Sequence, residues 1–140
     1  MILVVDASVA LKWFFQNHAD EADCDAALTI LTGIDQGHIQ LVQPPHFIAE
    51  VSAVLAREKP KEAEHDLFDL LTIESRLCSE PAIYSTAIDL SIHCRHHLFD
   101  TLYHAVALHT TGANLITADI TYYQKAQSVG RVLHLQDFSG

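Results

Sequence analysis

Short apolar runs alternate along the chain with longer stretches in which apolar residues recur at helical spacing. Residues 2–5 (ILVV) form a continuous, largely β-branched apolar run, which is typical of a strand buried on both faces. Residues 20–35 instead carry Ala, Ile and Leu side chains at the spacing of an amphipathic helix. By this reasoning the sequence predicts strands at 2–5, 39–42, 76–80, 114–117 and 131–135, of which 76–80 has the weakest pattern. It predicts helices at 9–15, 20–35, 46–58, 61–74, 82–94, 100–110 and 119–128.

Glycine and proline residues separate these segments. Gly37, Gly112 and Gly130 each follow a predicted helix, and Pro60 ends the helix at 46–58. Strands that alternate with helices favour crossover connections, which build a mostly parallel sheet with helices on both faces. The pattern therefore predicts an α/β fold, formed by residues 1–140 as a single domain.

The composition is that of a folded protein. Of the 140 residues, 49 % are hydrophobic and 19 % are charged, and a chain of this length can bury a core without disulfide bonds. The three cysteines are widely spaced and fit reduced thiols. No apolar run approaches the ~20 residues that cross a bilayer, and the opening MILVVD lacks the basic start of a signal peptide. We therefore expect a cytoplasmic protein without membrane contact.

The charge of the chain bears on its partners. Eighteen acidic and eight basic residues give a net charge of −10, which argues against a protein that coats nucleic acid through a basic surface. The same charge is compatible with an enzyme that reaches phosphates through metal ions, because an acid-rich site needs cations. Among the ten histidines, His93, His96 and His97 lie close together, but no HExxH motif occurs. We interpret this cluster as solvated imidazoles rather than a zinc site.

Two acidic residues fall where predicted strands end. Asp6 directly follows the strand at 2–5, and Asp119 lies two residues after Thr117, which ends the strand at 114–117. Ligands bind at the carboxyl ends of the strands in open parallel sheets, so both residues are candidates for a site. Both also precede predicted helices, where Asp is a favoured N-cap. Taken singly, each aspartate could serve only as a cap.

Two further acids belong to strongly apolar helices. Glu50 comes three residues after Phe47 and one before Val51, so it borders the apolar stripe of its helix. A carboxylate buried there requires a partner or a metal ion, although a small rotation of the helix would leave it at the surface. Asp100 opens the most apolar predicted helix, where the helix dipole also favours an acid. Together the four acids offer the hard oxygen ligands that Mg²⁺ prefers.

At these residues the sequence resembles the PIN-domain family, and within it the VapC-type toxins of type II toxin–antitoxin pairs. The resemblance rests on four segments in order, VVDASVALKWF, PPHFIAEVSAVLARE, LFDTLYHAVALHTTGANLITAD and RVLHL. It implies a three-layer α/β/α sandwich around a sheet of about five strands. It also implies a metal-dependent endoribonuclease in which Asp6, Glu50, Asp100 and Asp119 bind Mg²⁺ or Mn²⁺. Ser8 and Thr117 resemble the small hydroxyl residues beside such sites.

The same resemblance implies partners, and a mechanism follows as a hypothesis. The substrate would be RNA, the protein would form a homodimer, and a small antitoxin would lie across the active-site groove. Asp6 and Asp100 would be the main ligands of one ion, with Glu50 and Asp119 completing its shell or holding a second ion. Lys12 could contact the phosphate, although a solvated lysine is the simpler interpretation.

Other classes of protein share some of these features. A receiver-like phosphoacceptor module is also a small acidic α/β unit that binds Mg²⁺, but it would need two adjacent acids where this chain has Asp6 alone. A haloacid-dehalogenase-like phosphatase would need Asp-x-Asp in place of Asp6-Ala7-Ser8. A non-catalytic PIN-fold binding protein would have no need of all four acids. We therefore expect an endoribonuclease.

Overall fold

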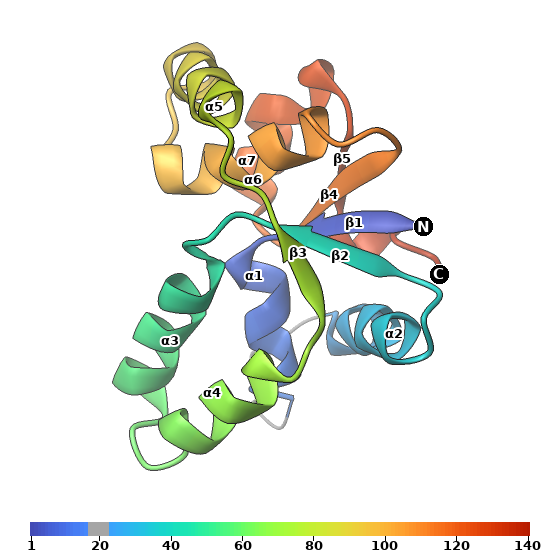
Figure 1. Ribbon diagram of the computed structural model, residues 1–140, viewed down its shortest axis with the longest axis vertical. Helices are drawn as coiled ribbons and strands as arrows, with labels where there is room; N and C mark the ends of the chain where they lie inside the picture. Colours follow the sequence, from blue (N-terminus) through green and yellow to red (C-terminus); the bar gives the residue numbers. More distant parts are fainter. Residues whose placement is uncertain (17–22) are drawn as a thin grey trace.

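A five-stranded sheet lies between two layers of helices in the computed structural model, which describes residues 1–16 and 23–140 (Figure 1). All neighbouring strands are parallel, and the strand order is β3-β2-β1-β4-β5. The strands are β1 (Ile2–Val5), β2 (Gln40–Gln43), β3 (Ser75–Leu77), β4 (Ala113–Thr117) and β5 (Val132–His134). The expected three-layer fold is confirmed, with an entirely parallel sheet.

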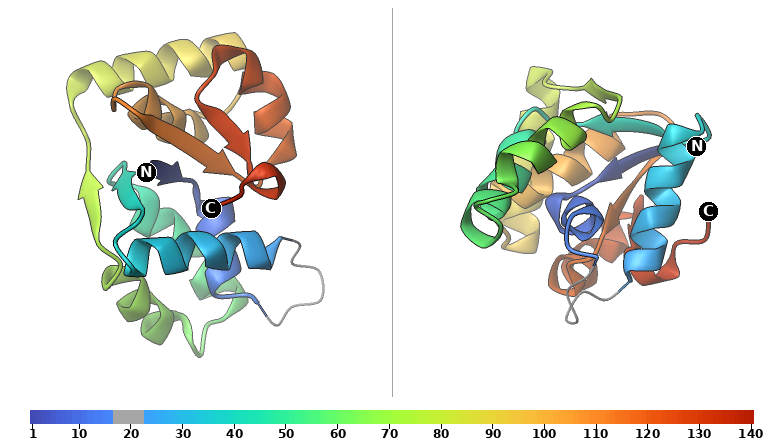
Figure 2. Two further views of the ribbon diagram at one scale, coloured as in Figure 1. Left: turned by 90° about the vertical axis from the view of Figure 1, so that its right-hand side faces the viewer. Right: turned by 90° about the horizontal axis from the view of Figure 1, so that it is seen from below.

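The helices are divided between the two faces of the sheet. Helices α1 to α4 lie on one side and α5 to α7 on the other, as the views in Figures 1 and 2 agree. Their bounds are α1 (Ala7–Ala10), α2 (Cys24–Asp35), α3 (Phe47–Glu58), α4 (Ala63–Leu71), α5 (Pro81–Cys94), α6 (Leu98–Leu108) and α7 (Ile120–Ala126). The described residues also form short 3-10 helices, which are η1 (Leu11–Trp13), η2 (Gln127–Val129) and η3 (Leu135–Asp137). Within the described ranges, no helix combines the length and apolarity needed to cross a membrane.

Strand β1 occupies the centre of the sheet because its side chains are apolar on both faces. Val4 and Val5 are fully buried, as expected of a strand covered by helices on either side. Helix α6 is the most enclosed helix, and all residues from Thr101 to Ala107 are buried. It packs against β1, β2 and β4 on one side and against α5 on another. This helix therefore holds the middle of one layer.

Several element ends differ from the sequence-based prediction. Helix α6 begins at Leu98 rather than at Asp100, and His97, with an extended backbone, takes the N-cap position. Asp100 is therefore the third residue of its helix. The predicted start of the helix at 20–35 lies outside the described residues, and the left-handed backbone of Asp23 makes Cys24 the first helical residue. Strand β3 is confirmed, but it is shorter and begins earlier than predicted.

Candidate functional site

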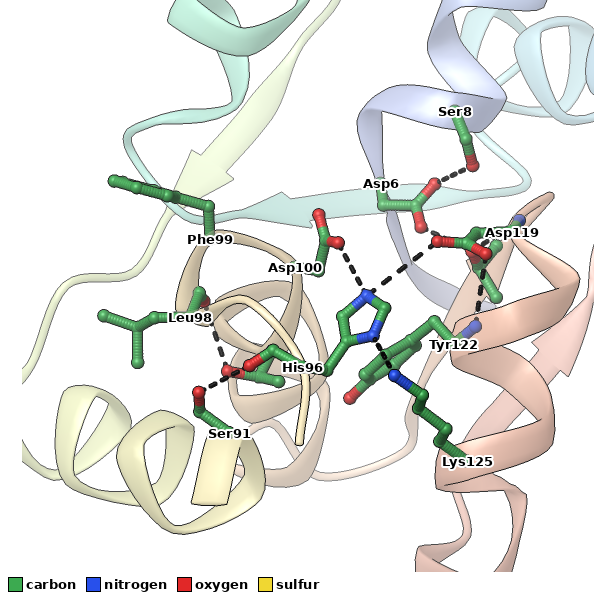
Figure 3. Close-up of polar contacts among 12 residues, drawn as sticks. Asp6, Ser8, Ser91, His96, Leu98, Phe99, Asp100, Asp119, Tyr122 and Lys125 are labelled. Carbon is green, nitrogen blue, oxygen red and sulfur yellow. Dashed lines mark hydrogen bonds and ion pairs between the residues drawn. The ribbon is translucent and has the colours of Figure 1, made fainter. Parts of the chain in front are cut away.

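Asp6 lies at the carboxyl end of the central strand and is only 8 % exposed. One carboxylate oxygen accepts a hydrogen bond from the Ser8 hydroxyl (Figure 3). The other accepts from the Thr117 hydroxyl. Burial raises the pKa of Asp6 to about 6, and the nearby Asp100 carboxylate adds to the rise, while the two hydroxyls oppose it. Because both donors are neutral, the charge of Asp6 is stabilised but not balanced by them. A bound cation would relieve this electrostatic penalty.

The pairing of β1 with β4 brings the second strand-end acid to the same place. The Asp6 amide donates to the Ile116 carbonyl at 3.3 Å. The Thr117 hydroxyl, which donates to Asp6, accepts from the Asp119 amide at 3.0 Å. Asp119 is also the N-cap of α7, since its Oδ1 accepts from the Tyr122 amide at 3.1 Å. Capping uses Oδ1 and leaves Oδ2 facing the site. Asp119 can therefore be both the N-cap of α7 and a residue of the site.

Asp100 reaches this group from the first turn of α6. Its Oδ2 lies 2.8 Å from Nε2 of His96, and the same nitrogen lies 3.9 Å from Oδ2 of Asp119 (Figure 3). One ligand atom from each of these three residues lies within 4.8 Å of the others. The interpretation of the histidine cluster as solvated imidazoles is wrong for His96, whose side chain is 10 % exposed and lies between two acids. It holds for His93 and His97, which are exposed.

Glu50 lies in the first turn of α3 and is held by two neighbours. Its Oε1 accepts from the Tyr103 hydroxyl at 2.6 Å and lies 3.4 Å from Nε2 of His46. Burial alone would raise the pKa of Glu50, but the contacts with His46 and Tyr103 outweigh it and hold the pKa below its ordinary value. Burial and the carboxylates of Glu50, Asp6 and Asp100 raise the pKa of Tyr103, which keeps its hydroxyl protonated as a donor. Tyr103 thereby holds Glu50 by a hydrogen bond within electrostatic range of Asp6 and Asp100.

Gln43 is a supporting residue that sequence reasoning missed. It is fully buried, its Oε1 accepts from the Val5 amide at 3.0 Å, and its Nε2 donates to the Val5 carbonyl at 2.8 Å. The paired Cα positions of β1 and β2 end at Leu3 and Leu41, so this side chain continues the pairing beyond the backbone ladder. It fixes the residue directly before Asp6. A single glutamine at a strand end carries no distinct sequence signal.

The structure therefore gathers most of the predicted site residues. Asp100 and Asp119 lie beside His96, and Asp6 is connected to Asp119 through Thr117. The hydroxyls of Ser8 and Thr117 donate to Asp6, as expected of small hydroxyl residues beside it. Lys12 lies in η1, beyond α1, and its contact with a phosphate stays a prediction. Carboxylates gathered this closely repel one another unless a cation offsets their charge. Their oxygens fit a hard divalent ion such as Mg²⁺ or Mn²⁺.

These features define an α/β/α protein with a candidate cation site at the carboxyl ends of β1 and β4. The model of the PIN domain matches residues 3–127, so the chain belongs to the PIN domain family. The resemblance drawn from the sequence is thereby confirmed, and the receiver-like and phosphatase alternatives are wrong.

Two solved structures are similar to this chain. PAE2754 from Pyrobaculum aerophilum superposes with a TM-score of 0.62 at 17 % identity, over 97 % of this chain and 93 % of that one. VapC20 from Mycobacterium tuberculosis, a toxin that cleaves the sarcin–ricin loop, superposes with a TM-score of 0.60 at 16 % identity, over 83 % of this chain and 87 % of that one. At these identities the similarity establishes a shared fold. No curated protein matches the chain.

Proposed function

We propose that the protein is a metal-dependent endoribonuclease and the toxin of a type II toxin–antitoxin pair. One observation carries the proposal. Asp6, Asp100 and Asp119 come from three separate elements and meet at the carboxyl ends of parallel strands in a member of the PIN domain family. Acids placed in this way suit the binding of a cation, and a cation suits the cleavage of phosphodiester bonds.

Each acid has a distinct role in this proposal. Asp6, Asp100 and Asp119 hold Mg²⁺ or Mn²⁺, and Ser8 and Thr117 fix the orientation of the Asp6 carboxylate. A divalent cation at this position supplies Lewis-acid activation of water and offsets the charge of the phosphate.

Glu50 completes the set of acids. It stays ionised because Tyr103 and His46 lower its pKa, so it can accept a proton from a water molecule or support the ligand shell. Lys12 is assigned to the phosphate of the substrate.

The substrate and partners follow from the same proposal. RNA is the substrate, and the bound cations offset part of the net charge of −10 that would otherwise repel it. The chain acts in the cytoplasm as a single domain over residues 1–140 and forms a homodimer. A small antitoxin, encoded beside the toxin, inhibits it by lying across the groove that holds the acids. The fold shared with a toxin that cleaves the sarcin–ricin loop supports this assignment.

Cleavage of RNA by matched variants tests the proposal. The purified protein is incubated with total RNA in Mn²⁺, in Mg²⁺ or in a chelator, and the cleaved ends are mapped. We expect cleavage with metal only, and a loss of at least about a hundredfold in Asp6→Asn and Asp100→Asn. Asp89→Asn is the matched control, because Asp89 is an exposed aspartate in the middle of α5.

Two outcomes would refute the proposal. Undiminished cleavage by Asp6→Asn and Asp100→Asn would show that these two carboxylates are not required for RNA cleavage. Binding of RNA without any cleavage in either metal would make the protein a non-catalytic PIN-fold binding protein.

A further inference from the structure

The ring of His96 bridges the acidic site and a lysine, with one nitrogen facing each. Nε2 lies 2.8 Å from Oδ2 of Asp100, and Nδ1 lies 3.2 Å from Nζ of Lys125. Figure 3 shows the ring between these two side chains, with Asp119 on the same side as Asp100. At first sight His96, Asp100 and Asp119 form a set of three metal ligands, with the histidine contributing nitrogen.

Lys125 determines which ring nitrogen carries the proton. An ammonium group has three donors and no acceptor, so the bond between Lys125 and His96 requires Nδ1 to accept. The proton of the neutral imidazole then lies on Nε2, which donates it to Asp100. A histidine that bound a cation through Nε2 would instead carry its proton on Nδ1. That proton would point at the ammonium of Lys125, so two donors would face each other.

From this geometry we propose that His96 is a positioning residue for Asp100 and not a metal ligand. Its Nε2–H holds Oδ2 of Asp100, and Lys125 keeps the proton on that nitrogen. The lone pairs of the Asp100 carboxylate that do not accept from His96 are thereby left for the cation. Among His96, Asp100 and Asp119, only carboxylate oxygens then bind the cation. The inference rests on the proposed function, since it assumes that the acids bind a divalent ion.

The surroundings of His96 suit such a role. Its side chain is 10 % exposed, and its ring packs at 4.8 Å between centroids against the ring of Tyr122. Its backbone is bonded twice to Ser91 of α5, through the amide at 3.2 Å and the carbonyl at 2.5 Å. Lys125 of α7 is anchored in turn by the Arg95 carbonyl at 3.1 Å. The bridge thus connects α5 and α7 to the acid on α6.

Loss of the bridge from Lys125 through His96 to Asp100 should weaken cation binding without changing the preference between Mg²⁺ and Mn²⁺. Partners that orient a ligating carboxylate contribute about tenfold to a hundredfold in metal affinity when they are removed. With an oxygen-only ligand set, the loss should be the same factor for Mg²⁺ and for Mn²⁺. A nitrogen ligand would give a different result, because imidazole favours Mn²⁺ over Mg²⁺.

Metal binding by the full-length wild type and three variants of it tests this inference. Mn²⁺ affinity is measured from the electron paramagnetic resonance signal of the free ion, and Mg²⁺ affinity by competition. We expect His96→Leu to bind both ions about tenfold more weakly, and Lys125→Met to bind both several-fold more weakly. His93→Leu is the control, because His93 is exposed in the last turn of α5. Lys125 is exposed as well, so Lys125→Met tests the bridge without disturbing the core.

The outcomes separate the possible roles. His96 is a ligand, and the inference fails, if Mn²⁺ in the wild-type protein shows the electron-spin-echo coupling of a directly bound ¹⁴N that disappears in His96→Leu. The inference also fails if Lys125→Met binds Mn²⁺ more tightly than the wild type does. It fails as well if the wild type binds both ions and His96→Leu binds them with the same affinity. Absence of binding in the wild type would instead reject the proposed function, and this inference with it.

Discussion

Replacing Asp6 by Asn should stabilise the metal-free protein even though it removes a proposed cation ligand. The pKa of Asp6 is raised from 3.8 to about 6, so folding favours the protonated form. The penalty for the ionised form is absent below the unfolded-state pKa, grows as the pH rises, and is complete above pH 6. Each tenfold change in acidity corresponds to about 1.4 kcal/mol, so ionised Asp6 costs the fold on the order of 3 kcal/mol at pH 7.5.

Asparagine removes this charge but fits the site imperfectly. It keeps one oxygen that can accept from Ser8 or Thr117, whereas its NH₂ group requires the other hydroxyl to turn and accept. We allow about 1 kcal/mol for this mismatch, which leaves a net gain of about 2 kcal/mol. For a domain of this length the gain corresponds to a rise in Tm of roughly 6 °C.

Urea unfolding in a chelator measures this gain. The wild type, Asp6→Asn and the control Asp89→Asn are compared at pH 7.5 and pH 5. The lowered pKa of His104 destabilises the fold as the pH falls below 6.5 in every variant. The pKa of Glu50 is lowered from 4.5, so Glu50 keeps most of its stabilising effect at pH 5. The informative quantity is therefore the difference between Asp6→Asn and the wild type. It should be about 2 kcal/mol at pH 7.5 and below about 1 kcal/mol at pH 5.

The reasoning fails if Asp6→Asn is less stable than the wild type at pH 7.5, or if the difference between them is independent of pH. Either result would show that the buried carboxylate is already balanced within the protein. The electrostatic argument for a cation beside Asp6 would then be lost. A value near zero for Asp89→Asn at both pH values is needed to attribute the effect to burial.

Three further predictions concern the surroundings of the site and the core. Saturating Mn²⁺ or Mg²⁺, at a hundred times its dissociation constant, should stabilise the wild type by about 2.7 kcal/mol in a urea titration, and Asp100→Asn should lose most of this gain. Tyr103→Phe removes the hydroxyl that holds Glu50 and should lower stability by about 2 kcal/mol; an unchanged urea midpoint would show that the bond is not needed. Trp13→Phe leaves the Ala27 carbonyl without its donor at 2.8 Å and should cost about 1–2 kcal/mol, measurable in the same assay.

The strand-end acids were predictable because sheet geometry is simple. Once the pattern of 2–5 and 114–117 indicates two parallel strands, their carboxyl ends must lie at the same edge of the sheet. That rule makes Asp6 and Asp119 candidates for one site, whereas helix capping accounts for an aspartate at either position by itself. Glu50 was predictable for a different reason, since an acid beside an apolar helical stripe calls for a partner, and Tyr103 is that partner.

The histidine bridge was not predictable from the same rules. His96 lies four residues before Asp100, which suggests one face of a helix, but α6 begins only at Leu98. Its contact with Asp100 therefore depends on the loop between α5 and α6, and the left-handed backbone of Arg95 directs that loop. Lys125 joins from a third helix far along the chain. A local sequence pattern cannot describe an interaction made by three separate elements. The absence of a zinc motif such as HExxH also favoured the interpretation of these histidines as solvated side chains.

The central position of β1 has a consequence for the timing of synthesis. This strand is made first, but its partner β4 and the hydroxyl of Thr117 come much later, 111 positions after Asp6. At about 5–20 residues per second, a ribosome needs roughly 6–22 s to add that stretch. Helix α6 is added only late in this interval, and Asp119 follows Thr117, so the group of acids is incomplete until the interval has ended. Cleavage of RNA by the proposed site would therefore begin only after β4 and Asp119 have been translated.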